Sequence, residues 1–115
     1  MTNLWVKDEG KNPTGSFKDK ESIVAINAAR EFGFKNLLVV SSGNAAVSTA
    51  AYAQKAGLSC ICRVPQSLSV GKRFLLNLYG AQMDVCAGSY EDLYRKAVDH
   101  PIDAWNITPG YNPYK

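Results

Sequence analysis

The sequence predicts an α/β domain in which an open parallel sheet of about four strands is flanked by helices in three layers, α/β/α. Short apolar runs alternate with segments long enough for helices, and this alternation favours right-handed βαβ crossovers. In addition, Gly33, Gly57 and Gly80 stand where a helix would end and hand over to a strand. They recur at nearly even spacing, as repeated βα units would require.

The expected strands are runs too apolar to be half exposed, which suits a sheet covered on both faces. A further run at the start of the chain, Leu4 to Lys7, is expected to be the fourth strand. The predicted strands are therefore 4–7, 36–40, 58–64 and 82–87, and the predicted helices are about 16–32, 44–56, 69–79 and 89–99.

Two of these helices should differ in their burial. The helix at 44–56 is apolar around most of its circumference, so more than the sheet should cover it. The helix at 89–99 instead has one apolar stripe, formed by Tyr90, Leu93, Tyr94, Ala97 and Val98. Only that stripe is expected to meet the sheet.

Composition excludes several classes of protein. The 115 residues are enough for one domain, and 46% hydrophobic with 20% charged residues is typical of a globular chain. The net charge of +3 comes from scattered side chains, so no nucleic-acid surface is expected. No apolar run approaches the roughly 20 residues of a membrane span, and no leader follows Met1. We therefore expect a cytoplasmic protein with no membrane partner.

The three cysteines do not predict disulfides or a metal site. An odd number cannot pair fully, and Cys60 and Cys62 would point to the same face of a strand, as reduced core residues. His100 is the only histidine, and no Cys-x-x-Cys pair exists. A zinc site would lack a recognisable ligand set, so no metal is expected.

Lys18 stands at a helix start, directly after a turn and a hydroxyl that could cap the helix. The positive end of the helix dipole disfavours an ammonium there, which makes the free amine easier to reach. Such lysines form Schiff bases with carbonyl compounds, including the aldehyde of pyridoxal phosphate. An ordinary solvated lysine remains the alternative.

The same segment resembles two nucleotide-binding motifs only in part. Gly10 to Ser16 reads Gly-x-x-x-x-Gly-Ser, but a triphosphate-binding loop needs Lys directly after the second glycine. No two glycines are spaced Gly-x-Gly, which excludes a dinucleotide fingerprint. A nucleoside triphosphatase and a dinucleotide-dependent enzyme are therefore not expected.

A second candidate site is the polar turn Ser41-Ser42-Gly43-Asn44 between a predicted strand and a predicted helix. Free backbone N–H groups at such a helix start bind anions, and a substrate carboxylate would fit. Simple N-capping by Ser and Asn is the alternative. Because strand-to-helix loops of a parallel sheet open on one edge, we expect this turn to converge with Lys18.

Two motifs give the sequence a resemblance to a known family. They are Lys-Asp-Glu at 7–9 with Asn-Pro-Thr-Gly-Ser-Phe-Lys-Asp at 12–19, and Ser-Ser-Gly-Asn at 41–44. Later segments at 56–58, 79–81, 88–92 and 112–114 follow in the expected order. Over nearly its whole length the chain resembles fold-type II pyridoxal phosphate enzymes, closest to threonine synthases.

The resemblance implies roles for individual residues. Lys18 would form the internal aldimine with pyridoxal 5'-phosphate and later move protons at the α and β carbons of the substrate. Asn44 would contact the phenolic oxygen of the cofactor, and Phe17 would lie against its ring. The residues implied for the amino-acid carboxylate are Ser41, Ser42, Gly43, Asn44 and Ala45. In threonine synthases the substrate is O-phosphohomoserine, which loses phosphate and gains water.

The chain also departs from the family. Gly110 and Lys115 stand where serine and arginine often serve the substrate phosphate, so Lys115 is the implied substrate residue here. Lysine keeps the charge but lacks the bidentate fork of arginine. A related β-replacement or elimination enzyme, such as a cysteate synthase or a threonine or serine dehydratase, is therefore an alternative. A non-catalytic domain that binds small carboxylates is another.

Family members are several times longer, and their loop for the cofactor phosphate comes after this region. Residues 1–105 are therefore expected to be the small domain with the Schiff-base lysine, and 106–115 the start of a crossover to a larger, absent domain. The isolated chain is expected to be inactive. The larger domain and an amino-acid substrate are its expected partners, and a homodimeric parent is one option that the sequence does not decide.

Overall fold

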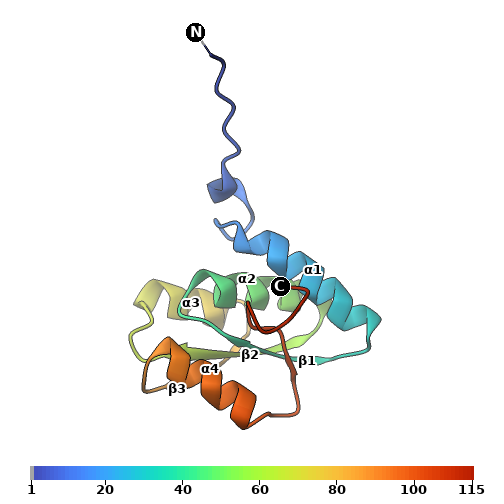
Figure 1. Cartoon of the computed structure of the whole chain (residues 1–115), viewed down its shortest axis with the longest axis vertical. Coiled ribbons are helices and arrows are strands. Elements are labelled where there is room, and N and C mark those ends of the chain that lie inside the picture. Colours follow the sequence, from blue (N-terminus) through green and yellow to red (C-terminus); the bar gives the residue numbers. More distant parts are fainter. Residues whose placement is uncertain (1) are drawn as a thin grey trace.

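The computed structural model describes residues 2–115, and they form the predicted α/β fold (Figure 1). A single sheet contains four parallel strands in the order β3-β2-β1-β4. The elements are η1 (Glu9–Lys11), α1 (Lys18–Glu31), β1 (Asn36–Val40), α2 (Asn44–Ala56), β2 (Ser59–Pro65), α3 (Val70–Leu78), β3 (Gln82–Cys86), α4 (Tyr90–Asp99) and β4 (Trp105–Asn106).

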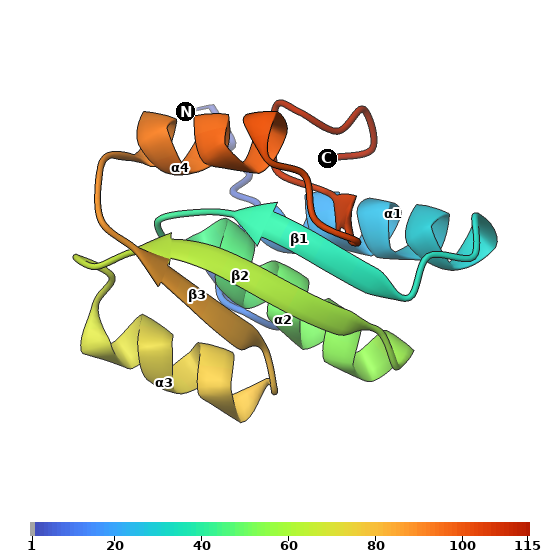
Figure 2. The same ribbon diagram turned by 90° about the horizontal axis from the view of Figure 1, so that it is seen from below.

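The helices cover both faces of the sheet, which confirms the predicted three layers. Figure 2 shows α4 on one face and α2 and α3 on the other. The side chains of β1 alternate accordingly, because Leu37 and Val39 join the core under α1 and α2 whereas Leu38 and Val40 pack with Leu93 of α4. All five of these side chains are at most 1% exposed. The sheet is therefore buried on both faces, as its apolar strands require.

The helix ends are as predicted. Gly33, Gly57 and Gly80 have φ angles of +79°, +71° and +68°, a left-handed conformation that side chains with a Cβ rarely adopt. Each follows α1, α2 or α3 and precedes the next strand. The glycines thus end these helices and turn the chain back towards the sheet.

The burial of α2 is also as predicted, since α2 packs against the sheet and against both α1 and α3. The apolar stripe of α4 is narrower than predicted. Leu93 and Ala97 are buried, but Tyr90 and Val98 remain 38% and 39% exposed. Tyr90 and Val98 lie at the edges of the stripe, beyond the part of the helix that faces the sheet.

The prediction of a strand at Leu4 to Lys7 is wrong. Leu4, Trp5 and Val6 are 87%, 91% and 78% exposed, and this segment projects away from the domain (Figure 1). A strand forms only beside a partner whose N–H and C=O groups it can pair with, and here the segment leads away from the sheet. The fourth strand is instead β4, which pairs with β1 at Leu37 and Leu38.

The base of this segment is attached to α1 by Glu9. Its carboxylate lies 2.6 Å from the Lys20 amine and 3.1 Å from the Lys7 amine, and it accepts a hydrogen bond of 2.6 Å from the Asn12 amide. The interactions with Lys20, Asn12 and Lys7 lower the pKa of Glu9 to about 2. Glu9 and Lys20 thus form an exposed ion pair at the start of α1.

Cys60 and Cys62 point to the same face of β2, as predicted. Both are buried and reduced, with their Sγ atoms 3.6 Å apart. The contact with Cys60 and burial raise the pKa of the Cys62 thiol. Within residues 2–115, no group of three or more metal-ligating side chains is assembled, and no helix has the length and apolar character to cross a membrane.

Candidate active site

Lys18 is the first residue of α1, so the prediction that it lies in the first helical turn is confirmed. Phe17 precedes it as the N-cap and makes no capping hydrogen bond with its side chain. The Ser16 hydroxyl instead accepts a hydrogen bond of 3.3 Å from the backbone N–H of Lys18. The turn before α1 therefore places the Lys18 side chain at the positive end of the helix.

The amine of Lys18 is paired rather than freely solvated. It lies 3.0 Å from each carboxylate oxygen of Glu21, and 4.8 Å from the centre of the Phe17 ring. The side chain of Lys18 is 24% exposed. Both neighbours attract a positively charged amine, which the sequence analysis, based on the helix dipole alone, did not foresee. The (i, i+3) spacing of Lys18 and Glu21 was visible in the sequence.

The turn before α2 leaves polar groups free. The N-cap of α2 is Gly43, so neither serine nor asparagine caps this helix. The Ser41 hydroxyl accepts a hydrogen bond of 3.0 Å from the Gly43 N–H, while Ser42 and Asn44 are exposed. The simple N-capping alternative is therefore wrong. The first N–H groups of α2 lack partners within the helix, as at any helix start, and are available to an anion.

Lys72, in the first turn of α3, lies over this turn. Its ammonium nitrogen is so close to Gly43 that a Cβ at residue 43 would be 2.5 Å from it. The site thus contains a cation beside the start of α2, which the sequence analysis missed. Because α3 follows β2, the rule that loops after parallel strands share one edge could have found Lys72.

A buried polar network joins the start of α1 to the second turn of α2. The Asp19 carboxylate accepts hydrogen bonds of 2.7 Å from the Ser48 hydroxyl and 2.8 Å from the Thr14 N–H, and Ser48 also lies 2.8 Å from the Ser22 hydroxyl. Asp19, Ser22 and Ser48 are at most 3% exposed. This network joins the start of α1, where Lys18 lies next to Asp19, to the second turn of α2.

The convergence of Lys18 with the turn before α2 was predicted from the geometry of parallel strands, and it stays a prediction. Lys18 does not follow a strand of the sheet, so the geometry of parallel strands cannot place it. The contact between Asp19 and Ser48 instead joins the start of α1, where Lys18 lies, to α2. Ser48 lies four residues after Asn44 on the same face of α2, so Asn44 is one helical turn from this contact.

Asp19 is charged in this network. Burial acts to raise the pKa of Asp19, but the hydrogen bonds from the Thr14 side chain, the Thr14 backbone and Ser48 outweigh burial and hold the pKa below its usual 3.8. A carboxylate with a lowered pKa stabilises the fold above the pKa of the unfolded state. That contribution is lost as the pH falls through the lower folded-state pKa.

We expect Asp19→Ala to lower the free energy of unfolding at pH 7 by about 2–4 kcal/mol, because buried donors at Thr14 and Ser48 lose their acceptor. The wild-type chain should lose this advantage below pH 3.8, so the two proteins should approach each other in stability on acidification. Urea unfolding between pH 7 and pH 2.5 measures this difference. A constant difference over that range would show that the charge of Asp19 contributes nothing.

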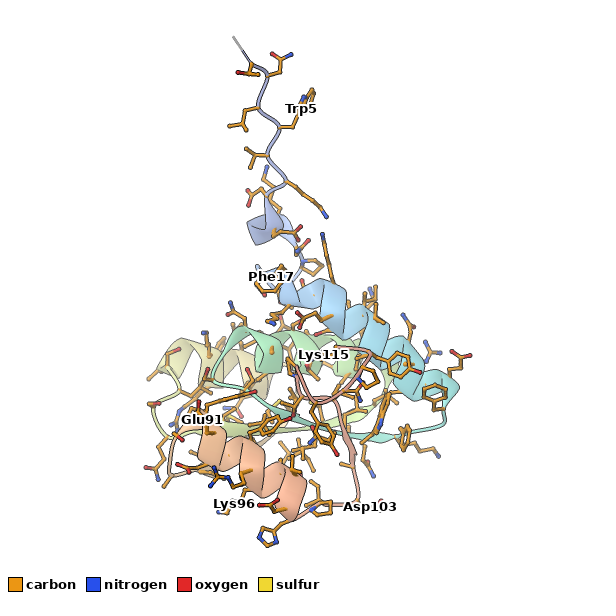
Figure 3. All side chains as sticks on the ribbon, in the orientation of Figure 1. Trp5, Phe17, Glu91, Lys96, Asp103 and Lys115 are labelled. Carbon is orange, nitrogen blue, oxygen red and sulfur yellow. The ribbon has the colours of Figure 1, made fainter. Side chains whose placement is uncertain are left out.

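Lys115 reaches the same region from the end of the chain. Its amine donates a hydrogen bond to the Thr49 hydroxyl on α2. Figure 3 shows Phe17 at the start of α1 and Lys115 apart from it, over the middle of the domain. Burial lowers the pKa of Lys115 to about 8, with the nearby charge of Lys18 acting in the same direction and that of Glu21 against it. Lys115 therefore belongs to the charge cluster around Lys18.

The predicted site residues thus fall into two neighbouring groups. Lys18 and Phe17 lie at the start of α1, with the amine of Lys115 held by Thr49 on α2, and the residues of the second group form the turn and first residues of α2. This second group is Ser41, Ser42, Gly43, Asn44 and Ala45. These residues fit the aldehyde-bearing side of pyridoxal phosphate. Lys18 offers a primary amine, and Asn44, one helical turn from the contact between Asp19 and Ser48, offers an exposed amide.

Comparisons with known proteins identify the family of this chain. Residues 1–115 match the family model described as "Pyridoxal-phosphate dependent enzyme". The chain is 36% identical over 117 residues to a threonine synthase from Bacillus sp. (strain ULM1), covering 97% of this chain and 32% of that protein. This chain therefore spans about a third of the length of such relatives.

Solved structures share the fold. A hydrogen sulfide-producing enzyme superposes with a TM-score of 0.78 at 24% identity, covering 96% of this chain and 36% of the other. A pyridoxal 5'-phosphate-dependent aspartate racemase superposes with a TM-score of 0.75 at 28% identity, covering 89% and 32%. With the family match over its full length, the chain belongs to the pyridoxal-phosphate dependent enzymes.

Proposed function

We propose that this chain is the small catalytic domain of a threonine synthase-like lyase, which converts O-phosphohomoserine to threonine by eliminating phosphate and adding water. The observation that carries the proposal is the position of Lys18 at the start of α1, next to Asp19, which contacts Ser48 in the second turn of α2. The likeness to threonine synthases along nearly the whole chain supports this choice of substrate.

Lys18 is the residue that holds the cofactor in this proposal, because an amine is needed to condense with its aldehyde. Bound pyridoxal phosphate supplies an electron sink for negative charge at the α carbon of the substrate. Lys18 then moves protons at the α and β carbons. Asn44, which is exposed, donates to the phenolic oxygen of the cofactor, and Phe17, 54% exposed, is free to turn towards its ring.

The turn before α2 binds the substrate carboxylate in this proposal. Free N–H groups at the helix start and the hydroxyl of Ser42 act as donors, and the ammonium of Lys72 adds attraction for an anion. The N–H of Gly43 is already used by Ser41, so the groups at Asn44 and Ala45 carry most of the binding. The carboxylate would thus be held on α2 while Lys18 acts from α1.

Lys115 serves the substrate phosphate, and residues 106–115 begin the crossover to a larger domain that completes the site. With a pKa of about 8, its amine carries the positive charge on most molecules at neutral pH. The remaining two thirds of the relatives' length leaves room for that larger domain. The isolated chain then lacks groups for the cofactor phosphate and is inactive alone.

A second candidate is another β-replacement or elimination enzyme of the same family, of the cysteate synthase or threonine or serine dehydratase kind. One observation favours it, since the Lys115 amine is engaged by Thr49 rather than free for a phosphate. Gly110, which has no side chain, also offers no hydroxyl at its position. Both features would suit a substrate without a phosphate group.

The test uses the full-length parent with pyridoxal phosphate and separate assays with O-phosphohomoserine, serine and threonine. The proposal predicts release of inorganic phosphate and formation of threonine in equal amounts from O-phosphohomoserine. Release of ammonia from serine or threonine, without phosphate release from O-phosphohomoserine, would exclude this function in favour of the dehydratase alternative. No reaction with any of the three would contradict both the proposal and the dehydratase alternative.

A further inference from the structure

We propose that Glu21 is a positioning residue for Lys18, which holds the amine in a bidentate ion pair and restrains its reactivity until a ligand draws it away. This inference rests on the proposed function only in giving Lys18 a chemical role. The ion pair itself is observed in the structure, where the Lys18 amine contacts Glu21 and lies over the ring of Phe17.

The pair of Lys18 and Glu21 is bidentate and partly shielded from water. Both oxygens of Glu21 lie 3.0 Å from the Lys18 nitrogen, so the carboxylate faces the amine symmetrically. The two side chains are 24% and 28% exposed, whereas Lys20 in its pair with Glu9 is 50% exposed. Partial shielding from water strengthens the attraction between unlike charges.

Glu21 is the carboxylate that neutralises Lys18. The neighbouring acid, Asp19, is turned towards Thr14 and Ser48 and is occupied by their hydrogen bonds. Lys115 is close enough to act on both Lys18 and Glu21, and its positive charge leaves the cluster with two cations for one anion. An anionic ligand is therefore attracted to the cluster, while the amine stays paired in the absence of one.

The pair affects reactivity because an ammonium has no lone pair. Lys18 must lose one proton to solvent before its nitrogen can form a bond to carbon, and the nitrogen must also leave the carboxylate. The Phe17 ring, 4.8 Å from the nitrogen, is a second contact that the amine must leave. A neutral residue at position 21 should therefore raise the fraction of Lys18 that reacts, without any change in the rest of the site.

The experiment is competitive acetylation of the full-length parent, free of cofactor, with trace acetic anhydride at pH 8. Mass spectrometry of peptides gives the rate at Lys18 relative to the exposed reference Lys55. We expect Glu21→Gln to raise the relative rate at Lys18 by about three- to tenfold, from the usual strength of a partly shielded ion pair. Glu21→Asp keeps the charge and should restore part of the restraint.

Glu9→Gln is the matched control, since it removes an ion pair from Lys20 on the same helix. It should raise the rate at Lys20 and leave the rate at Lys18 unchanged. An equal rate at Lys18 in wild type and Glu21→Gln would overturn the proposal, and so would a slower rate, because the carboxylate would then be assisting the amine. A merely structural role of Glu21 would alter all lysines of α1 alike.

The result is independent of the proposed function. Acetic anhydride needs no cofactor site, so a failure of the Glu21 proposal leaves the enzymatic role of Lys18 intact. Conversely, if Lys18 did not react with pyridoxal phosphate in the parent, the proposed function would fail while the acetylation rates would still report on the pair with Glu21.

Discussion

Lys18→Ala in the full-length parent is expected to lower turnover by about 10³-fold or more. Without the amine, the cofactor cannot be held covalently, and the α carbon of the substrate loses the group that moves its proton. No other lysine can take over from the first turn of α1, because Lys20 is engaged by Glu9 on the exposed side of the helix. The loss should therefore appear in turnover far more than in substrate affinity.

The same substitution should leave the fold nearly as stable as before, with a melting temperature within about 4 °C of wild type. Removing a cation from the start of α1 relieves an unfavourable interaction with the helix dipole. It also removes the pair with Glu21, but a carboxylate in the first helical turn is favourable by itself. These effects are small and opposite in sign.

Lys20→Ala provides the control for both measurements, since it removes a lysine two residues away that pairs with Glu9. It should leave turnover within about twofold of wild type, as expected for an exposed ion pair. A large loss of stability in Lys18→Ala with turnover per folded molecule unchanged would show that Lys18 is a structural residue.

The sequence was sufficient to predict most of the fold, because the elements follow from local chemistry. Gly33, Gly57 and Gly80 determine where three helices end, and the apolar runs after them have nowhere to lie except in a covered sheet. The segment at Leu4 to Lys7 has a composition typical of a strand, but strand formation depends on a partner that lies elsewhere. Composition alone does not report that partner.

The sequence predicted the individual residues of the candidate site but not the contacts between their side chains. Lys18 and the turn at Ser41 to Asn44 are recognisable from residue type and from their place at helix starts. The contact between Asp19 and Ser48, residues 29 positions apart, depends on how α1 packs on α2, and no periodic pattern encodes it. Glu21 could have been found by its helical spacing from Lys18, had the electrostatic argument included side chains as well as the helix dipole.

The central claim is that Lys18 is the lysine that bonds to pyridoxal phosphate. Reduction of the full-length parent with sodium borohydride, in the presence of one equivalent of pyridoxal phosphate, converts the linkage to a stable C–N bond. Peptide mass spectrometry then identifies the modified lysine. The account predicts that the label lies on Lys18 and is absent from the same peptide in Lys18→Ala. Label on Lys115, or spread over surface lysines with Lys18 unmodified, would contradict it.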